Sequence, residues 1–98
     1  MRILLVEDNL ALADGLAALL RQSGYAVDMV HDGASAEALA AAESFDLVIL
    51  DLNLPQMDGL DVLRAMRSRK NAAAVMILTA RGAPKSVSKG WIWGRTTI

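Results

Sequence analysis

Three places in this sequence put acidic or hydroxyl side chains directly after an apolar segment. Glu7 and Asp8 follow the first of these segments. Asp51 follows a later one, and Thr79 follows the last. Ligands of parallel sheets bind beyond the carboxyl ends of the strands. If the apolar segments are neighbouring strands of such a sheet, three carboxylates converge at one of its edges.

Carboxylates a few ångströms apart repel one another, so such a cluster needs a cation or a shared proton. Oxygen ligands without His or Cys favour Mg²⁺ or Mn²⁺ over zinc, and such an ion commonly orients a phosphate. A carboxylate can also act as a nucleophile and form an aspartyl phosphate. Asp51 is the better nucleophile candidate, because it ends the most hydrophobic segment. Glu7 and Asp8 then serve as metal ligands, directly or through water, and Thr79 can offer its hydroxyl to a phosphoryl oxygen.

Each acid taken alone has a simpler interpretation, because acidic residues after strands often belong to turns or cap helices. Three of them at the ends of expected neighbouring strands favour a functional site instead. His31 is a single histidine near a turn, without a visible metal-binding neighbour. We expect His31 to be exposed to solvent and to take no part in catalysis.

The elements that must position these side chains alternate along the chain. Short apolar or alternating segments predict strands at residues 3–6, 25–30, 45–50 and 74–78. Apolar residues at helical spacing, or alanine-rich sequence, predict helices at residues 10–20, 34–43 and 60–67. Strand–helix alternation with apolar strands implies right-handed crossovers and a doubly wound parallel sheet of the α/β class.

Signals at the helix ends support this division. Asp8 or Asn9 can cap the first helix, and Gly24 is well placed to end it. Asp58 or Gly59 lies near the start of the third helix.

Composition indicates one small globular domain. The chain has 98 residues, of which 54% are hydrophobic and 21% charged, so a disordered chain is not expected. A net charge of -1 gives no basic field for nucleic acid, and the absence of Cys excludes disulfides, thiolate zinc sites and Cys nucleophiles. The longest apolar run, residues 72–78, is too short to span a membrane, and the N-terminus does not resemble a signal peptide. We therefore expect a cytoplasmic protein.

The composition changes near residue 84. Residues 1–84 carry seven basic and eleven acidic side chains, a net charge of -4. Residues 85–98 carry three basic side chains, no acid and both tryptophans. We therefore divide the chain into a patterned body, residues 1–84, and a tail, residues 85–98, which we expect to be irregular.

Six short motifs run along the body: Ile3-Leu4-Leu5-Val6-Glu7-Asp8, Gly24-Tyr25, Asp32-Gly33, Asp46-Leu47-Val48-Ile49-Leu50-Asp51-Leu52-Asn53-Leu54-Pro55, Met57-Asp58-Gly59 and Ile77-Leu78-Thr79-Ala80. In order and spacing they resemble the receiver domain of two-component response regulators. The subclass that looks most similar has its receiver before a winged-helix DNA-binding domain. The resemblance implies a flavodoxin-like sheet with strand order 2-1-3-4.

The resemblance also implies roles for particular residues. Asp51 would be the phosphoacceptor, which takes a phosphoryl group from a phosphohistidine on a sensor histidine kinase. Glu7 and Asp8 would match the acidic pair that holds Mg²⁺, together with Asp51 and the backbone carbonyl of Asn53. Thr79 would match the switch hydroxyl that moves toward the phosphoryl group. In intact members of the family, phosphorylation controls DNA binding and transcription.

Several family features are not recognisable in this sequence. The family's fifth strand ends in a Lys-Pro pair whose lysine contacts the phosphoryl oxygens, and neither Lys85 nor Lys89 matches it. The fourth helix, fifth strand and fifth helix, which usually form the signalling and dimer face, are not recognisable either. We therefore expect a truncated receiver that folds marginally, lacks the dimer face and binds neither nucleic acid nor membrane directly.

A change of reading frame can explain the tail. When the third base of each codon is read with the first two of the next, residues 89–98 are compatible with Gly-Leu-Asp-Leu-Gly-Ala-Asp-Asp-Tyr. That sequence resembles the usual continuation of the family. We hypothesise a one-base deletion just after Pro84, and a natural divergent tail is the alternative.

Three functional interpretations remain at this point. The first is a phosphoacceptor module, which is not an enzyme and receives its phosphoryl group on Asp51. The second is an inactive remnant of such a regulator. The third is a phosphatase with an aspartyl nucleophile, but that class needs a second aspartate two positions later, where this sequence has Asn53.

Overall fold

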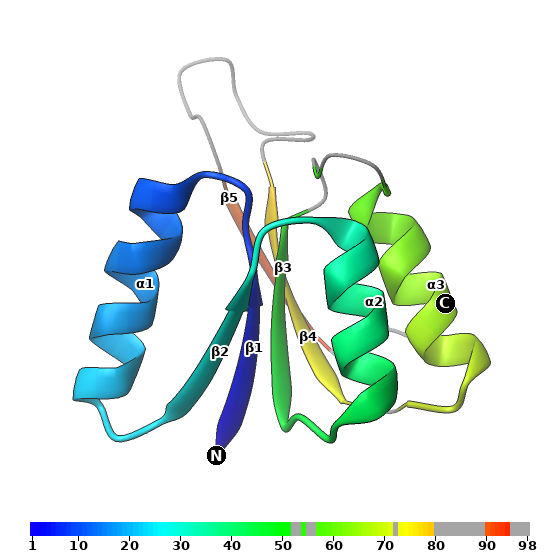
Figure 1. Cartoon of the computed structure of the whole chain (residues 1–98), viewed down its shortest axis with the longest axis horizontal. Coiled ribbons are helices and arrows are strands. Elements are labelled where there is room, and N and C mark those ends of the chain that lie inside the picture. The colour runs from blue at the N-terminus through cyan, green and yellow to red at the C-terminus, as the bar shows by residue number, and fades with distance from the viewer. Residues whose placement is uncertain (52–53, 55–56, 72, 80–89, 95–98) are drawn as a thin grey trace.

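The computed structural model describes residues 1–51, 54, 57–71, 73–79 and 90–94, and for residues 79 and 90–94 it describes the backbone alone. Strands and helices alternate along this part of the chain (Figure 1). The strands are β1 (Arg2–Val6), β2 (Ala26–Val30), β3 (Leu47–Asp51), β4 (Ala74–Thr79) and β5 (Gly90–Gly94). The helices are α1 (Leu10–Gln22), α2 (Gly33–Ala42) and α3 (Gly59–Ser68). The strands and helices predicted for the body are therefore confirmed, with bounds shifted by one or two residues.

The first four strands form a parallel sheet in the order β2-β1-β3-β4. This arrangement confirms the predicted fold class and strand order. β1 and β3 lie side by side at the centre, with Leu5 opposite Ile49. Both strands are almost continuously apolar because helices cover both faces of the sheet, so neither face meets water.

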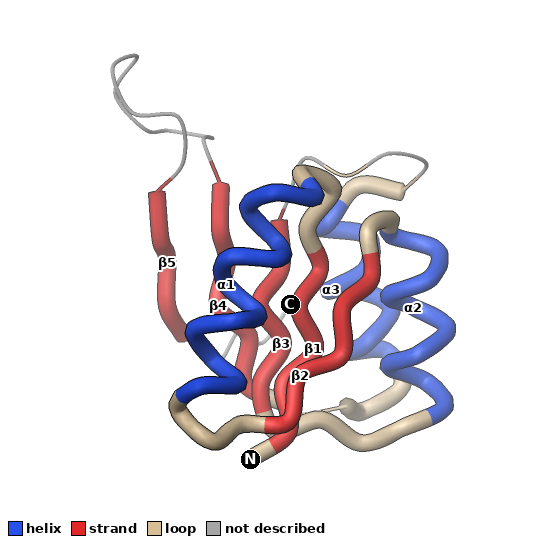
Figure 2. The backbone as a smooth tube through the Cα atoms, turned by 60° about the vertical axis from the view of Figure 1, so that its left-hand side comes forward, coloured by secondary structure: helices blue, strands red, loops and turns tan. Residues whose placement is uncertain are grey.

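Successive residues of the central strands face opposite sides of the sheet. Leu4 and Val48 belong to the core that packs against α2 and α3. Leu5 and Ile49 belong to a second core, which packs against α1. Figures 1 and 2 show this division, with α1 on one side of the sheet and α2 and α3 on the other.

All three helices begin near the edge where the parallel strands end (Figure 1). Asn9, Asp32 and Asp58 cap them, and each side chain accepts a hydrogen bond from a backbone N–H two or three residues ahead, at 3.1, 2.7 and 3.0 Å. Gly24, with a φ of 95°, follows α1, where a left-handed conformation favours glycine. No helix within the described residues has both the length and the apolar character needed to cross a membrane.

The tail contains a strand where we expected irregular chain. β5 runs antiparallel to β4, with Val75 opposite Gly94 and Thr79 opposite Gly90. Two causes account for this correction. The stretch Gly-Trp-Ile-Trp-Gly holds aromatic and β-branched residues that favour strands, and without a partner β4 would present a row of unpaired backbone groups. The division of the chain at residue 84 stays a prediction.

Candidate functional site

The ends of β1 and β3 bring the predicted acidic residues to one edge of the sheet. Val6, the last residue of β1, lies opposite Leu50 of β3. Glu7 follows Val6 directly, and Asp51 is the last residue of β3, so the two acids stand at the same level of neighbouring parallel strands. Asp8 continues from Glu7 toward the start of α1.

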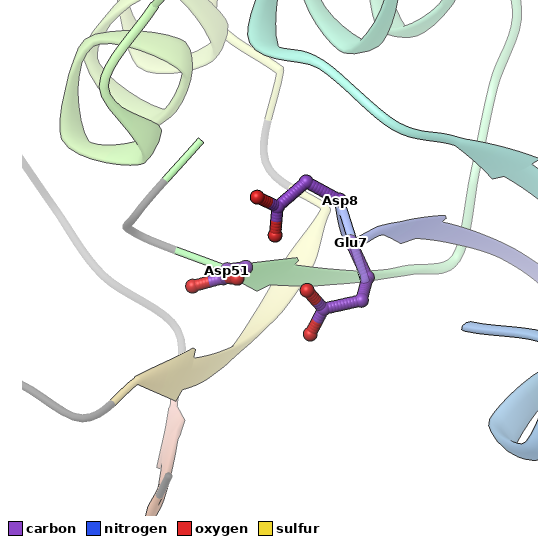
Figure 3. Close-up of side chains that lie close together, drawn as sticks. All are labelled: Glu7, Asp8 and Asp51. Carbon is purple, nitrogen blue, oxygen red and sulfur yellow. The ribbon is translucent and has the colours of Figure 1, made fainter. Parts of the chain in front are cut away.

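The three carboxyl groups gather around one space (Figure 3). Glu7, Asp8 and Asp51 each offer an oxygen, and these oxygens lie within 4.8 Å of one another. Glu7 and Asp51 are buried, at 0% and 1% exposure, while Asp8 is exposed. The cluster therefore has two buried walls and one side that reaches solvent, and the convergence of carboxylates predicted from the sequence is confirmed.

Backbone groups fix Glu7 within this cluster. Its N–H donates to the carbonyl of Val30 at 3.1 Å. Its side-chain Oε2 accepts a hydrogen bond from the N–H of Asn9, also at 3.1 Å. The second contact therefore fixes the orientation of a fully buried carboxyl group.

This donor set fits a hard divalent cation. It consists of carboxylate oxygens alone, which suits Mg²⁺ or Mn²⁺ and does not suit zinc. Three carboxylates at this separation repel one another unless positive charge or a proton intervenes. Asp8 is exposed, so solvent reaches this side of the cluster. Mg²⁺ in proteins usually keeps water and phosphate oxygens among its ligands.

Two predicted site residues are only partly covered by the structure. Asn53 lies outside the described residues. Thr79 is the last residue of β4, and the register of β3 and β4 sets Asp51 opposite Leu78. The backbone of Thr79 therefore lies at the same edge of the sheet as the acidic cluster.

His31 lies at the same edge, and it is more buried than the solvent-exposed side chain that we expected. The side chain is half-buried, and its Nδ1 lies 2.9 Å from the carbonyl oxygen of Glu7. Its position directly after β2, at the level of Glu7, was the available signal. The residue types around His31 indicate neither a metal site nor a contact with a backbone carbonyl.

Asp32, the residue after His31, accepts hydrogen bonds that change its pKa. The backbone N–H of Ser35 and then its hydroxyl donate to the Asp32 carboxylate, and together they lower the pKa of that group below its usual value. Asp32 therefore acts as a charged cap at the start of α2.

Comparisons with known proteins identify the same kind of domain. A family model for the response regulator receiver domain matches residues 3–96. The transcriptional regulatory protein TctD of Salmonella typhimurium is 47% identical over 90 residues, which cover 92% of this chain and 40% of TctD. The response regulator protein PmrA of Pseudomonas aeruginosa is 48% identical over 81 residues, 83% of this chain and 37% of PmrA. The chain thus spans about two fifths of the length of these relatives.

Solved structures agree with this match. The response regulator protein TrrA of Thermotoga maritima, in complex with Mg²⁺-BeF, is 34% identical with a TM-score of 0.78, over 87% of this chain and 74% of that one. A receiver domain of a Pseudomonas aeruginosa sensor histidine kinase, with magnesium coordinated in its active site cleft, is 34% identical with a TM-score of 0.80, over 87% and 71% of the two chains. The matched family is a signal-receiving domain and not a family of enzymes. By sequence, fold and the acidic edge of its sheet, this chain belongs to the response regulator receiver domain family.

Proposed function

We propose that this chain is the phosphoacceptor module of a two-component phosphorelay, and that Asp51 receives the phosphoryl group from a sensor histidine kinase. The observation that carries the proposal is the placement of Asp51 beside Glu7 and Asp8, with oxygens within 4.8 Å of one another. The 47% identity to a transcriptional regulatory protein supports it. No other described group of acidic side chains converges in this way.

The same three side chains are the proposed Mg²⁺ ligands. Glu7 and Asp51 would form the buried part of the site, and Asp8 the part open to solvent. The backbone carbonyl of Asn53 is a further proposed ligand, on the resemblance to the family. When bound, the ion would offset the negative charge of the carboxylates and of the incoming phosphoryl oxygens.

The proposed reaction uses the Asp51 carboxylate as nucleophile. One of its oxygens forms a bond to phosphorus as the bond from phosphorus to the kinase histidine nitrogen breaks, and the leaving imidazole keeps that electron pair and takes a proton. The product is an acyl phosphate on Asp51. Thr79 is the proposed hydroxyl donor to a phosphoryl oxygen, and its backbone position at the same edge of the sheet supports that role.

The partners proposed for this chain follow from the family. A sensor histidine kinase is the phosphoryl donor, and the cytoplasm is the proposed compartment. In an intact parent protein, phosphorylation would control DNA binding by a separate domain, as the regulatory relatives suggest. The chain described here would not itself bind DNA.

A direct test incubates the purified chain with Mg²⁺ and a small phosphodonor such as phosphoramidate. Intact-mass measurement should show one added phosphoryl group on the wild-type chain and none on Asp51→Asn. The matched control is Asp14→Asn, an exposed carboxylate on α1, which should be labelled like the wild type. Equal labelling of Asp51→Asn would refute the proposal. A folded wild-type chain that binds Mg²⁺ but takes no phosphoryl group would favour the inactive remnant instead.

A further inference from the structure

The connection between β2 and α2 reaches across to the backbone of Glu7. The β1–β2 pairing extends one residue past the last strand pair, because the N–H of Glu7 donates to the carbonyl of Val30 at 3.1 Å. The carbonyl of Glu7 is then met by the imidazole of His31, with 2.9 Å between Nδ1 and the oxygen. Where β2 ends, a histidine side chain thus makes the next hydrogen bond to the chain that follows β1, in place of a backbone group. The chain then turns, and Asp32 caps α2.

The chemistry of the two atoms fixes the direction of this hydrogen bond. A carbonyl oxygen can only accept, so Nδ1 of His31 carries the proton and donates. Both the neutral ring in this tautomer and the charged ring have a proton on Nδ1. The contact therefore does not depend on the charge of His31.

The carbonyl that His31 contacts lies between two residues of the acidic cluster. It belongs to the peptide unit that joins Glu7 to Asp8, and that unit is planar. A donor that holds the carbonyl therefore sets the direction in which the chain leaves Glu7 and enters Asp8. The side chain of Glu7 is held separately, by the N–H of Asn9 at 3.1 Å.

We propose that His31 is a positioning residue for the acidic site. It touches neither the metal nor the phosphoryl group, and it acts by fixing the Glu7–Asp8 peptide so that both carboxylates face Asp51. The inference rests on the proposed function and goes further, because it assigns part of the metal affinity to a side chain outside the ligand set. Partners of this kind commonly change metal affinity by about 10-fold or more when removed.

Three variants of the full chain separate the hydrogen bond from simple packing. His31→Ala removes the ring, and His31→Phe keeps a ring but has no donor. His31→Asn keeps a donor, because its amide N–H₂ can stand near the place of Nδ1. The Mg²⁺ dissociation constant is measured by isothermal titration calorimetry, and the melting temperature is measured without metal.

The expected result is about 10-fold weaker Mg²⁺ binding for His31→Ala and His31→Phe, and binding within about 3-fold of the wild type for His31→Asn. Mg²⁺ affinities that are equal in all folded variants would overturn the proposal, whatever the melting temperatures do. If His31→Ala does not fold, the comparison of His31→Phe with His31→Asn decides alone. A folded wild-type chain that binds no Mg²⁺ would instead overturn the proposed function, and this inference with it.

Discussion

At the scale of single residues, the site consists mainly of two buried carboxyl groups at the ends of neighbouring strands. Glu7 and Asp51 are almost fully excluded from solvent, and their oxygens lie within 4.8 Å of each other. Charges of the same sign at that separation disfavour the folded state, and the repulsion is stronger in a protein interior than in water. The repulsion therefore destabilises the folded state at the place where the proposed chemistry occurs.

Removal of one of these charges should stabilise the metal-free protein. We expect Asp51→Asn to raise the free energy of unfolding by about 1 kcal/mol in the presence of a chelator, because the repulsion with Glu7 and Asp8 falls. Urea denaturation measures the difference, with Asp14→Asn as the control for loss of an exposed charge. A metal-free Asp51→Asn chain that is less stable than the wild type would contradict this reading of the cluster.

Mg²⁺ should stabilise the wild type more than Asp51→Asn, because Asp51 is one of the proposed ligands. An ion that binds the folded state alone adds about 2.7 kcal/mol of stability at 100 times its dissociation constant. We expect the melting temperature of the wild type to rise with Mg²⁺ concentration, and that of Asp51→Asn to rise much less. Scanning calorimetry across a Mg²⁺ series checks this, and an equal rise in both proteins would mean that the ion binds elsewhere.

At the scale of elements, the connection from β2 to α2 contacts both the segment that follows β1 and the segment that follows β3. His31 contacts the carbonyl of Glu7, Asp32 caps α2, and Gly33 begins the helix. Gly33 also lies very close to Met57, in the segment after β3: a Cβ added to it would stand 2.6 Å from the Met57 carbonyl oxygen. Glycine is needed here because the two backbones approach so closely.

Gly33→Ala should therefore destabilise the fold by about 1–3 kcal/mol, because the new methyl group forces the backbone at Met57 to move. It should also weaken Mg²⁺ binding, since that segment follows the strand that carries Asp51. The matched control is Gly15→Ala in the middle of α1, where nothing lies within 4 Å of an added Cβ. That change should stabilise the chain by about 0.5–1 kcal/mol through helix propensity. Chemical denaturation of both variants tests the pair, and equal effects would contradict the close packing.

The cap of α2 makes a prediction about pH. The pKa of Asp32 is lowered in the folded state by donors from Ser35, relative to 3.8 for the unconstrained group. The stabilising contribution is therefore present above pH 3.8 and is lost as the pH falls through the lower, folded-state pKa. We expect the wild type to exceed Asp32→Asn in stability at neutral pH and to lose that advantage in acid. Urea midpoints of both proteins as a function of pH measure this, and a constant difference would contradict it.

The sequence predicted the elements well where the signal is local. Apolar runs that end in Glu7 and Asp51 indicate both a buried parallel strand and the residue at its end, so the acidic edge could be predicted along with the sheet. The contact between His31 and the Glu7 carbonyl could not be predicted, because it depends on how the chain turns after β2 and not on residue type. β5 was missed for a related reason. Its three residues between two glycines are too few to show a periodicity, and the pairing arises from the open edge of β4.

At the scale of the whole molecule, the tail adds a fifth strand to the sheet, at the edge beside β4. β5 is antiparallel to β4, so it closes an edge without extending the parallel series that positions the site. The site residues at the ends of β1 and β3 lie at the centre of the sheet, and β4 separates β3 from β5. The parallel strands β1 and β3 alone therefore position the acidic cluster.

A chain that ends at residue 84 tests the contribution of the tail. Its fourth strand becomes an open apolar edge, which is a template for pairing with other copies. We expect this shortened chain to aggregate at lower protein concentration than the full chain and to melt at a lower temperature. Light scattering and circular dichroism check both, and a monomeric shortened chain of unchanged stability would show that β5 contributes nothing to the fold.

The central claim is that the acidic edge of the sheet is a metal-dependent phosphoacceptor site with Asp51 as its nucleophile. The most direct measurement treats the full chain with phosphoramidate, reduces any acyl phosphate with borohydride, and locates the modified residue by peptide mass spectrometry. Reduction of an aspartyl phosphate leaves homoserine, so the account predicts homoserine at position 51 with Mg²⁺ present and none with a chelator. Homoserine at another aspartate, or the same yield at position 51 without metal, would contradict it.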